Sequence, residues 1–451
     1  MNKNELRLLL EDWNFWTKEQ RTGISRERYL AKLNSLVQTN FVVAVTGSRR
    51  SGKSFIMRQM AKKLIADGLE PKNILFVNFE DPSFPARKDA AFLDEIFDAF
   101  YQYIAPDKQP TIFFDEIHEV AGFEKWIRKA HELQKARMII SGSNAHLLSP
   151  DLATIMTGRH LDVTVFPLSF REFLRFQGVE IKNSAEAFLN KPELNKWLYQ
   201  YLEFGAFPEV VLKNEKKEIL YRYFEDIITH DLLQRYKISK IQELRALVRF
   251  YMSNISSLIT FKSITRSMKL SINSVGNYSG YLEEAYLLFL VKRFDYKTKE
   301  QEKSPRKVYA IDTGLCNVIG FRFSENLGKL AENAVFLSLK RRQAGDFGME
   351  IYYWKDEAHR EVDFVIKNGL KVNELIQVCW NVDDEKTKAR EIRSLLKAMR
   401  EFKLNKAIVV TGEYEASETL EGKSIEYIPL GKWLLLNEDL DAGRIDNSLP
   451  L

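Results

Sequence analysis

The chain has 451 residues, enough for roughly three domains, and its 45% hydrophobic and 29% charged residues are typical of a folded protein. No apolar run reaches the ~20 residues of a membrane-spanning helix, the first residues do not resemble a secretory signal peptide, and Cys316 and Cys379 lie too far apart to indicate a disulfide framework or a zinc site. The net charge of +5 excludes no class of partner by itself, and we expect a cytoplasmic protein without membrane contact.

The first part of the chain alternates helical and strand patterns. Apolar residues at helical spacing predict helices within 1–38, 53–66, 90–103 and 123–135. Continuous apolar runs predict strands at 41–45, 74–79, 111–114, 137–141 and 163–166. Buried strands that alternate with helices are typical of a parallel sheet, so we expect an α/β fold.

A glycine-containing turn joins the strand at 41–45 to the helix at 53–66. It fits the phosphate-binding pattern GxxxxGK followed by Ser or Thr, with the residues Gly47, Ser48, Arg49, Arg50, Ser51, Gly52, Lys53 and Ser54. The glycines let the backbone wrap a phosphate, the helix N-terminus favours its negative charge, and the lysine neutralises its oxygens. We therefore expect this turn to bind ATP, with the Ser54 hydroxyl on Mg²⁺.

Two carboxylates follow the apolar run at 111–114. We expect Asp115 to hold Mg²⁺ and Glu116 to orient and deprotonate the attacking water. A small-molecule kinase needs no second carboxylate at this point, so Glu116 favours ATP hydrolysis over phosphoryl transfer. An acidic turn at the end of a strand is the simpler alternative.

Polar residues after the strand at 137–141 could contact the γ-phosphate. Ser143 or Asn144 would then be a sensor that hydrogen-bonds the phosphate or the attacking water, although either could equally belong to a plain turn. Arg159 is a candidate arginine finger, because a permanent planar charge stabilises the transferring phosphoryl group. An exposed structural arginine is the alternative.

These motifs together resemble the prokaryotic AAA-type ATPases of the archaeal-ATPase-like group. Besides the P-loop, the resemblance rests on FFDEI at 113–117, SGSN at 141–144, GR at 158–159 and PLSFREF at 167–173. Three later segments of this chain also resemble that group: GAFPE at 205–209, VYAIDTGL at 308–315 and EVDF at 361–364.

The resemblance implies an α/β multidomain protein with a domain of unknown function, similar to restriction-endonuclease folds, at its C-terminus. The expected sections are N-terminal helices over 1–38, the P-loop ATPase core over 39–170, a helical lid over 171–236, a winged helix over 237–310 and the nuclease-like domain over 311–451. Helical patterns at 170–176, 193–204 and 216–236 agree with the expected lid.

The section 237–310 contains fourteen Lys or Arg residues and six Asp or Glu residues, a net charge of +8. Within it we expect two helices joined by a turn, the second over 272–290 with Ser271 as its N-cap, and then a basic hairpin wing. This arrangement favours binding of double-stranded DNA through 257–310, with Arg266, Asn273 and Asn277 approaching the grooves. A protein-packing module is the alternative.

The C-terminal section places three candidate ligands of a second metal site on its expected helix and strands: Glu332, Asp363 and Gln377. Cys379 stands where a nuclease of this type has its lysine, and Lys386 or Lys388 would have to replace it. We therefore expect a domain that has lost or weakened cleavage, with an ATP-regulated nuclease as the alternative. For the whole chain we expect a Mg²⁺-dependent ATPase; an ATP-dependent switch or DNA-binding adaptor, and a homo-oligomer, remain open.

Overall fold

The computed structural model describes residues 3–86, 88–142, 158–181, 191–321 and 326–441. The chain forms two compact units, Met1–Phe166 and Pro167–Leu451. The helices after Pro167 therefore belong to the second unit, and the finer division into five sections stays a prediction. No helix within the described ranges is long and apolar enough to cross a membrane.

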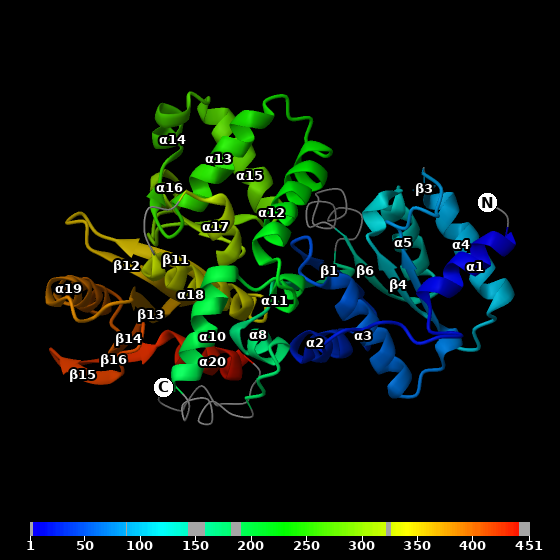
Figure 1. Ribbon diagram of the computed structural model, residues 1–451, viewed down its shortest axis with the longest axis horizontal. Coiled ribbons are helices and arrows are strands. Elements are labelled where there is room, and N and C mark those ends of the chain that lie inside the picture. The colour runs from blue at the N-terminus through cyan, green and yellow to red at the C-terminus, as the bar shows by residue number, and fades with distance from the viewer. Residues whose placement is uncertain (1–2, 87, 143–157, 182–190, 322–325, 442–451) are drawn as a thin grey trace. The chain divides into compact units, whose positions relative to one another are not determined.

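A parallel sheet of five strands forms the centre of the first unit, in the order β2-β4-β6-β1-β7 (Figure 1). Its strands are β1 (Val42–Gly47), β2 (Ile74–Asn78), β4 (Thr111–Asp115), β6 (Arg137–Ser141) and β7 (His160–Val165). All neighbouring strands pair in parallel, which confirms the expected α/β fold. A short parallel pair, β3 (Lys88–Asp89) and β5 (Val120–Ala121), lies outside this sheet.

Helices cover both faces of the parallel sheet. One apolar cluster joins α1 (Lys3–Trp13), α4 (Ala90–Tyr103) and α5 (Phe123–Glu132) to side chains such as Leu75 and Phe114. A second cluster joins α2 (Glu27–Val37) and α3 (Lys53–Ala66) to alternate residues of the same strands, such as Phe76 and Phe113. Because both faces are buried, the strands read as continuous apolar runs in the sequence.

The helices predicted within 1–38 form as α1 and α2, and the residues between them are not helical. There the buried Asn14 side chain both donates to the Phe76 carbonyl (2.8 Å) and accepts from the Phe76 N–H (2.6 Å). Trp16 donates to the Ile74 carbonyl at 2.8 Å. These bonds satisfy backbone groups on the free edge of β2, which a continued helix could not do.

The second unit begins with helices, as expected. They are α8 (Phe170–Phe176), α10 (Lys191–Phe204), α11 (Pro208–Leu212), α12 (Lys216–Asp226), a π-helix (Ile227–Leu233) and α13 (Ile241–Ser253). Two more helices, α17 (Thr313–Ile319) and α18 (Leu327–Gln343), lead into the C-terminal sheet. The middle of the chain is thus mainly helical.

A helix-turn-helix also forms, with α14 (Phe261–Met268) followed by α15 (Ile272–Glu284). The Ser271 hydroxyl caps α15 by accepting the Ser274 N–H at 3.0 Å, which confirms the predicted N-cap. The expected end of this helix at residue 290 is wrong, because Tyr286 adopts a left-handed conformation (φ 55°) that turns the chain into the next strand. The sequence pattern also predicts Tyr278 on the polar face of this helix, and this prediction is wrong because Tyr278 is buried.

A small antiparallel sheet follows, in the order β8-β10-β9. It consists of β8 (Leu258–Ile259), β9 (Leu288–Val291) and β10 (Arg306–Ala310). The connection from β9 to β10, expected to be an extended wing, contains the helix α16 (Thr298–Lys303). Glu302 on this helix pairs with Lys292 and Arg306, one from each neighbouring strand segment, and these ion pairs hold the connection against the sheet.

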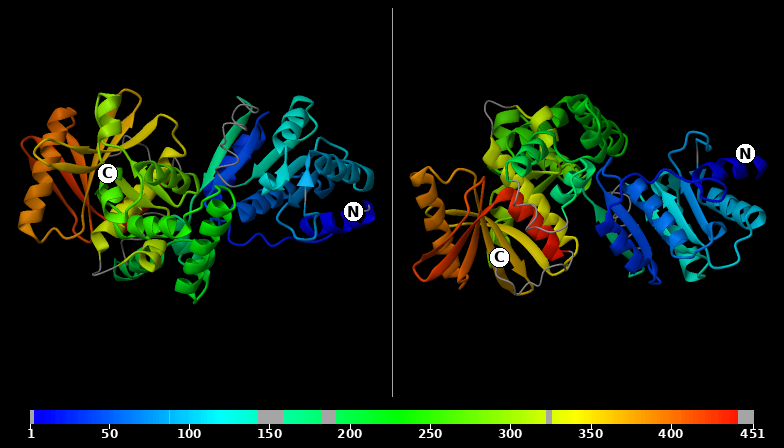
Figure 2. Two further views of the ribbon diagram at one scale, coloured as in Figure 1. Left: turned by 90° about the horizontal axis from the view of Figure 1, so that it is seen from above. Right: turned by 60° about the horizontal axis from the view of Figure 1, so that its bottom comes forward.

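A mixed six-stranded sheet forms the C-terminal part, in the order β11-β12-β13-β14-β16-β15. The strands are β11 (Met349–Lys355), β12 (Glu361–Asn368), β13 (Lys371–Cys379), β14 (Lys406–Thr411), β15 (Ala416–Leu420) and β16 (Lys423–Pro429). The helix α19 (Glu385–Glu401) packs on one face, while α20 (Leu430–Asp441) lies on the other (Figure 2). Apolar patterns in the sequence predict strands near 350–354, 362–366, 374–379 and 406–411, and β11 to β14 confirm them; β15 and β16 were not predicted.

Two motifs that are distant in the sequence meet in the second unit. The buried Asp312 carboxylate accepts the N–H of Ala206 at 2.6 Å and that of Leu315 at 3.0 Å. A Cβ on Gly205 would lie 2.0 Å from the Asp312 carboxylate, and one on Gly314 would lie 2.2 Å from the Phe204 carbonyl oxygen. The GAFPE and IDTGL stretches therefore form a close-packed structural junction.

Candidate functional site

The P-loop follows β1 and leads directly into α3. Gly47 has a φ of 134°, and a Cβ there would lie 2.1 Å from the Val165 carbonyl oxygen. Gly52 precedes α3 in a left-handed conformation with a φ of 99°. Both positions therefore require glycine, and together they shape the turn that brings backbone N–H groups to the N-terminus of α3.

Lys53 is almost fully buried within this turn. Its ammonium group donates to the carbonyl oxygens of Gly47 and Ser48, each at 3.3 Å. The hydroxyls of Ser48 and Ser51 are buried without a hydrogen-bond partner among the described residues. Since buried polar groups are normally paired, these hydroxyls fit a loop that is completed by a bound ligand.

Asp115 and Glu116 lie at the end of β4, beside the P-loop. The Glu116 carboxylate is 3.9 Å from Lys53 Nζ. Burial, and then the charge of Glu116, raise the pKa of Asp115 to about 6, although a hydrogen bond from Ser141 opposes the shift. The structure thus brings these two carboxylates and Lys53 together.

A divalent cation fits this set of oxygens. Asp115 is fully buried, and its Oδ2 has no hydrogen-bond partner among the described residues. Ser54 is the second residue of α3, and its hydroxyl lies within hydrogen-bonding reach of the Asp115 carboxylate. Carboxylate and hydroxyl oxygens are ligands that Mg²⁺ prefers, so an unpaired buried carboxylate oxygen at this point agrees with a metal-binding role.

A histidine also contacts the acidic residues at the end of β4. Nδ1 of His118 lies 3.3 Å from the Glu116 carboxylate, and Nε2 lies 3.6 Å from the Glu119 carboxylate. Burial lowers the pKa of His118, so the imidazole is held mainly neutral near pH 7. A neutral imidazole leaves the negative charge of Glu116 in place.

Sequence reasoning missed a second buried cation that supports the P-loop. Arg26 precedes α2 and is buried; its guanidinium donates to the Ser51 carbonyl at 2.9 Å and to the Phe166 carbonyl at 3.0 Å. An arginine in a connecting segment has no local signature, because its partners lie 25 and 140 residues further along the chain. It ties the P-loop to the end of β7.

Arg159 lies at the opposite edge of the sheet from the P-loop. Its carbonyl accepts the N–H of Val42 at 2.9 Å, and its guanidinium pairs with Glu132 at 3.2 Å. Arg159 lies next to Val42, where β1 begins, whereas Gly47 is where β1 ends. The five residue steps between these two positions span roughly 16 Å. Arg159 therefore does not reach the P-loop of its own chain. The other candidates, Ser143 and Asn144, lie outside the described residues.

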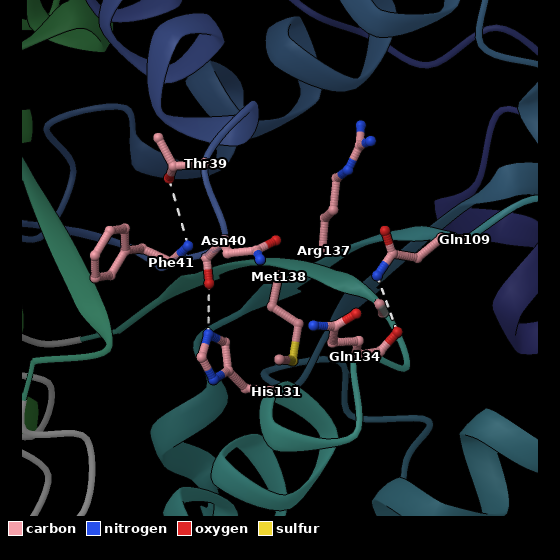
Figure 3. A pocket seen from close by; sticks show the side chains of 9 residues that line it. Thr39, Asn40, Phe41, Gln109, His131, Gln134, Arg137 and Met138 are labelled. Carbon is pink, nitrogen blue, oxygen red and sulfur yellow. Dashed lines mark hydrogen bonds between the residues drawn. The ribbon is translucent and has the colours of Figure 1, made fainter.

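A small cavity lies where β1 and β6 begin, and Figure 3 shows the side chains that line it. It is lined by the segment Thr39–Phe41 together with polar residues that include Gln109, His131 and Arg137. His131 Nε2 contacts the Asn40 carbonyl at 2.5 Å, and Gln109 donates to the Gln134 carbonyl at 2.9 Å. Its volume of about 60 Å³ is far below the ~300 Å³ of a typical ligand pocket, so a nucleotide does not fit.

The basic section of the second unit is less charged at its surface than its composition indicates. Six of its fourteen basic side chains are ion-paired: Lys240, Arg245, Lys292, Arg293, Arg306 and Lys307. Lys262 and Arg266 on α14, and Lys269 at its end, are exposed and have no ion-pair partner among the described residues. Their spacing places them along one side of the helix.

A buried carboxylate cluster occupies the predicted second metal site. Asp363 on β12 and Glu332 on α18 lie together as expected, but a lysine lies between them. Lys307 Nζ on β10 is 2.6 Å from the Asp363 carboxylate, 2.9 Å from that of Glu332 and 3.0 Å from that of Glu361. Gln377 accepts the Asp363 N–H at 3.1 Å and donates to Glu391 at 2.7 Å.

The charges in this cluster are nearly balanced. Burial, and then the charge of Asp363, raise the pKa of Glu332 to about 8, so this carboxyl is mainly protonated at pH 7. Lys307 has a pKa well above its ordinary value, because the nearby carboxylates outweigh its burial. No three His, Cys, Asp or Glu side chains within the described ranges are grouped so as to hold a metal ion.

The lysine of the cluster is not the one that the sequence suggested. Lys388 pairs with Glu418 at 2.7 Å, and Lys386 is exposed. Burial raises the pKa of the Cys379 thiol to about 11, so this side chain carries no charge. A signal did exist: Lys307 and Tyr309 occupy alternate positions of one apolar strand and therefore share a face, and the Tyr309 hydroxyl donates to Glu332 at 2.6 Å.

Three family profiles match the sequence in succession. The profile described as "AAA domain" matches residues 39–174, and two profiles described as domains of unknown function, DUF8612 and DUF4143, match residues 195–325 and 327–433. The chain thus carries an AAA-family P-loop ATPase domain followed by two domains of unknown function.

Two curated proteins are similar to nearly the whole chain. An uncharacterized protein of Methanocaldococcus jannaschii is 34% identical over 410 residues, which are 88% of this chain and 88% of that protein. An uncharacterized protein of Haemophilus influenzae is 30% identical over 423 residues, 91% and 98% of the two chains. Among solved structures, a Walker-type ATPase of Pyrococcus abyssi has a TM-score of 0.44 at 14% identity, over 67% of this chain and 97% of that one.

Proposed function

The chain belongs to the same family as these two uncharacterized proteins and carries an AAA domain, and from that premise we propose that it hydrolyses ATP at the site formed by the P-loop, Asp115 and Glu116. One observation carries the proposal: the Glu116 carboxylate lies 3.9 Å from Lys53 Nζ, beside the buried Asp115. A carboxylate next to the lysine that binds the γ-phosphate is suitably placed to act as the general base for the attacking water.

Each residue has a separate task in this proposal. The P-loop N–H groups and Lys53 bind the phosphate oxygens, and Glu116 orients the water and accepts its proton. Mg²⁺, when bound, neutralises charge that develops on the β- and γ-phosphate oxygens. Asp115 Oδ2 and the Ser54 hydroxyl would hold that ion. Arg26 fixes the P-loop through the Ser51 carbonyl.

Two substitutions separate binding from chemistry. We expect Lys53→Ala to abolish binding of Mg·ATP, and Glu116→Gln to bind it but lower turnover by about 100-fold or more. Glu95→Gln, the same change of charge on the exposed face of α4, is the matched control and should behave as the wild type. A wild-type protein that neither binds nor hydrolyses Mg·ATP would contradict the proposal.

The rate of ATP turnover distinguishes a motor or remodelling enzyme from a nucleotide switch. Unassisted switch proteins of the P-loop class hydrolyse more slowly than about 0.01 per second. A similar rate here, unchanged by added DNA, would favour a switch or adaptor in which hydrolysis only resets the conformation. A faster rate, or one that DNA increases, would favour a motor or remodelling enzyme.

We further propose that double-stranded DNA binds the section 257–310 through phosphate contacts. The support is the basic side of α14, where Lys262, Arg266 and Lys269 are exposed. Asn273 and Asn277, also exposed on α15, are available for contacts in the grooves. Lys307 is included in the net charge of +8 of the section 237–310, but it is buried and does not contribute to the basic surface.

A gel-shift assay at low and high salt tests this second proposal. Reversing the charges of Lys262, Arg266 and Lys269 to Glu should abolish the shift, because such binding depends on phosphate contacts and falls with salt. The matched control reverses the exposed Lys386, Arg393 and Lys397 on α19. Without a shift at low salt, this surface would instead be a protein-docking surface.

We also propose that the C-terminal carboxylate cluster does not cleave DNA. The support is Lys307, whose ammonium group takes the place among Glu332, Glu361 and Asp363 that a divalent cation would need. Incubation with plasmid DNA and Mg²⁺ or Mn²⁺, with and without ATP, should leave the DNA intact. Cleavage that disappears in Asp363→Ala would overturn this proposal and indicate an ATP-regulated nuclease.

A further inference from the structure

Ser141 is the last residue of β6, between the strand that carries the two carboxylates and the strand that leads into the P-loop. It is fully buried, pairs with Val45 of β1 and lies beside the end of β4. Its hydroxyl donates to Asp115 Oδ1 at 2.5 Å and accepts the backbone N–H of Glu116 at 3.0 Å. One hydroxyl therefore contacts both residues that act on Mg²⁺ and water.

The contacts of Ser141 determine which hydrogen bond its hydroxyl donates and which it accepts. A hydroxyl has one hydrogen to donate, and here it is directed to Asp115 Oδ1, which leaves the oxygen free to accept the Glu116 N–H. Ser141 thereby occupies Oδ1, and the Ser54 hydroxyl is the other side chain that hydrogen-bonds the Asp115 carboxylate. The hydrogen bond from Ser141 thus leaves Oδ2 as the Asp115 oxygen available to a cation held together with Ser54.

The second bond supports an unfavourable backbone conformation. Glu116 has φ 52° and ψ 45°, the left-handed region, which is sterically unfavourable for a residue with a Cβ. The bond from its N–H to Ser141 holds the chain in this turn, and the turn brings the Glu116 carboxylate to within 3.9 Å of Lys53 Nζ. Such conformations persist where surrounding contacts maintain them.

We infer that Ser141 is a positioning residue of the ATP site, which orients Asp115 and the left-handed turn of Glu116 through one hydroxyl. This inference rests on the proposed ATPase activity and adds a residue to which neither the P-loop pattern nor the acidic pair points. Ser141 acts through the two carboxylate residues, as groups behind a metal ligand commonly do.

Three variants of the full-length protein test the inference. We expect Ser141→Ala to lower kcat by about 10–100-fold and to raise the Mg²⁺ concentration that gives the half-maximal rate by a similar factor. The affinity for ATP, measured with a fluorescent analogue, should change by less than about threefold. Ser141→Thr retains the hydroxyl and should recover most of both losses; Ser141→Cys, a weaker donor of similar size, should fall between Ala and wild type. Thr164→Val is the matched control, because it removes a partly buried hydroxyl of β7 that contacts the Thr46 hydroxyl.

Each outcome separates the inference from the ATPase proposal. If the wild type hydrolyses ATP and Ser141→Ala keeps its kcat and Mg²⁺ dependence, the inference is wrong while the ATPase proposal stands. If activity falls only in proportion to the loss of folded protein, as seen in thermal unfolding, with an unchanged Mg²⁺ dependence, Ser141 is merely structural and the inference is again wrong. A wild type without ATPase activity refutes the underlying proposal instead.

Discussion

Replacing Lys307 with methionine is the most decisive perturbation of the second unit. Lys307 is 2% exposed, and its ammonium group lies within 3.0 Å of the carboxylates of Glu332, Glu361 and Asp363. Methionine has a similar length but no charge, so it removes the cation and leaves the packing nearly intact. The cost then depends on how many buried negative charges lose their partner.

The structure limits that number to one. Glu332, with a pKa of about 8, is mainly protonated at pH 7 and needs no cation. Glu361 keeps Lys355, whose ammonium group is 3.2 Å away. Among the residues that the structure describes, Asp363 keeps only the backbone N–H of Val378, at 2.8 Å. One uncompensated buried carboxylate costs about 3–5 kcal/mol, the usual effect of removing one partner from a buried ion pair.

Differential scanning calorimetry measures this cost. The transition of the second unit is identified as the one that Mg·ATP does not raise, since a ligand stabilises the unit that binds it. We expect Lys307→Met to lower this transition by at least about 5 °C. Adding Asp363→Asn should restore most of the loss, because it removes the unpaired charge. Lys355→Met, a partly exposed lysine, is the control and should cost at most about 1 kcal/mol. A melting temperature of Lys307→Met within about 2 °C of wild type would refute the reasoning.

Three further predictions concern stability and assembly. In the unfolded chain Glu332 has its ordinary pKa of 4.5, so between that pH and about 8 the native state binds more protons than the unfolded state. The free energy of unfolding therefore falls as pH rises through this range. Glu332→Gln should remove up to about 1.4 kcal/mol per pH unit of this fall, measured by denaturant titrations at pH 5 to 8. Gly314→Ala should destabilise the second unit by about 1–3 kcal/mol or prevent its folding, because the new Cβ would lie 2.2 Å from the Phe204 carbonyl oxygen; Gly280→Ala, with open space around it, should not. If Arg159 acts on the site of another copy, mixing Arg159→Ala with Lys53→Ala should restore ATPase activity; concentration-independent activity without rescue would make Arg159 structural.

Several elements were predictable because their signals are local. The strands of the parallel sheet are continuous apolar runs, since both faces are covered by helices, and the P-loop is a contiguous pattern whose glycines have φ values that other residues rarely adopt. The N-cap at Ser271 is local as well, because its hydroxyl reaches an N–H three residues away. The position of the break after α1 was not predicted, since it depends on Asn14 reaching Phe76 across 62 residues.

The sequence by itself determined the P-loop, because such a loop is built by neighbours along the chain and needs only a strand before it and a helix after it. The tertiary structure alone decided which groups stand behind Asp115 and which cation neutralises the carboxylates of the second unit. Ser141 reaches Asp115 because β6 lies beside β4, and Lys307 reaches Asp363 across 56 residues because β10 packs against the C-terminal sheet. A buried charge is stabilised by whatever partner the fold brings within about 3 Å, and that distance is independent of separation along the chain.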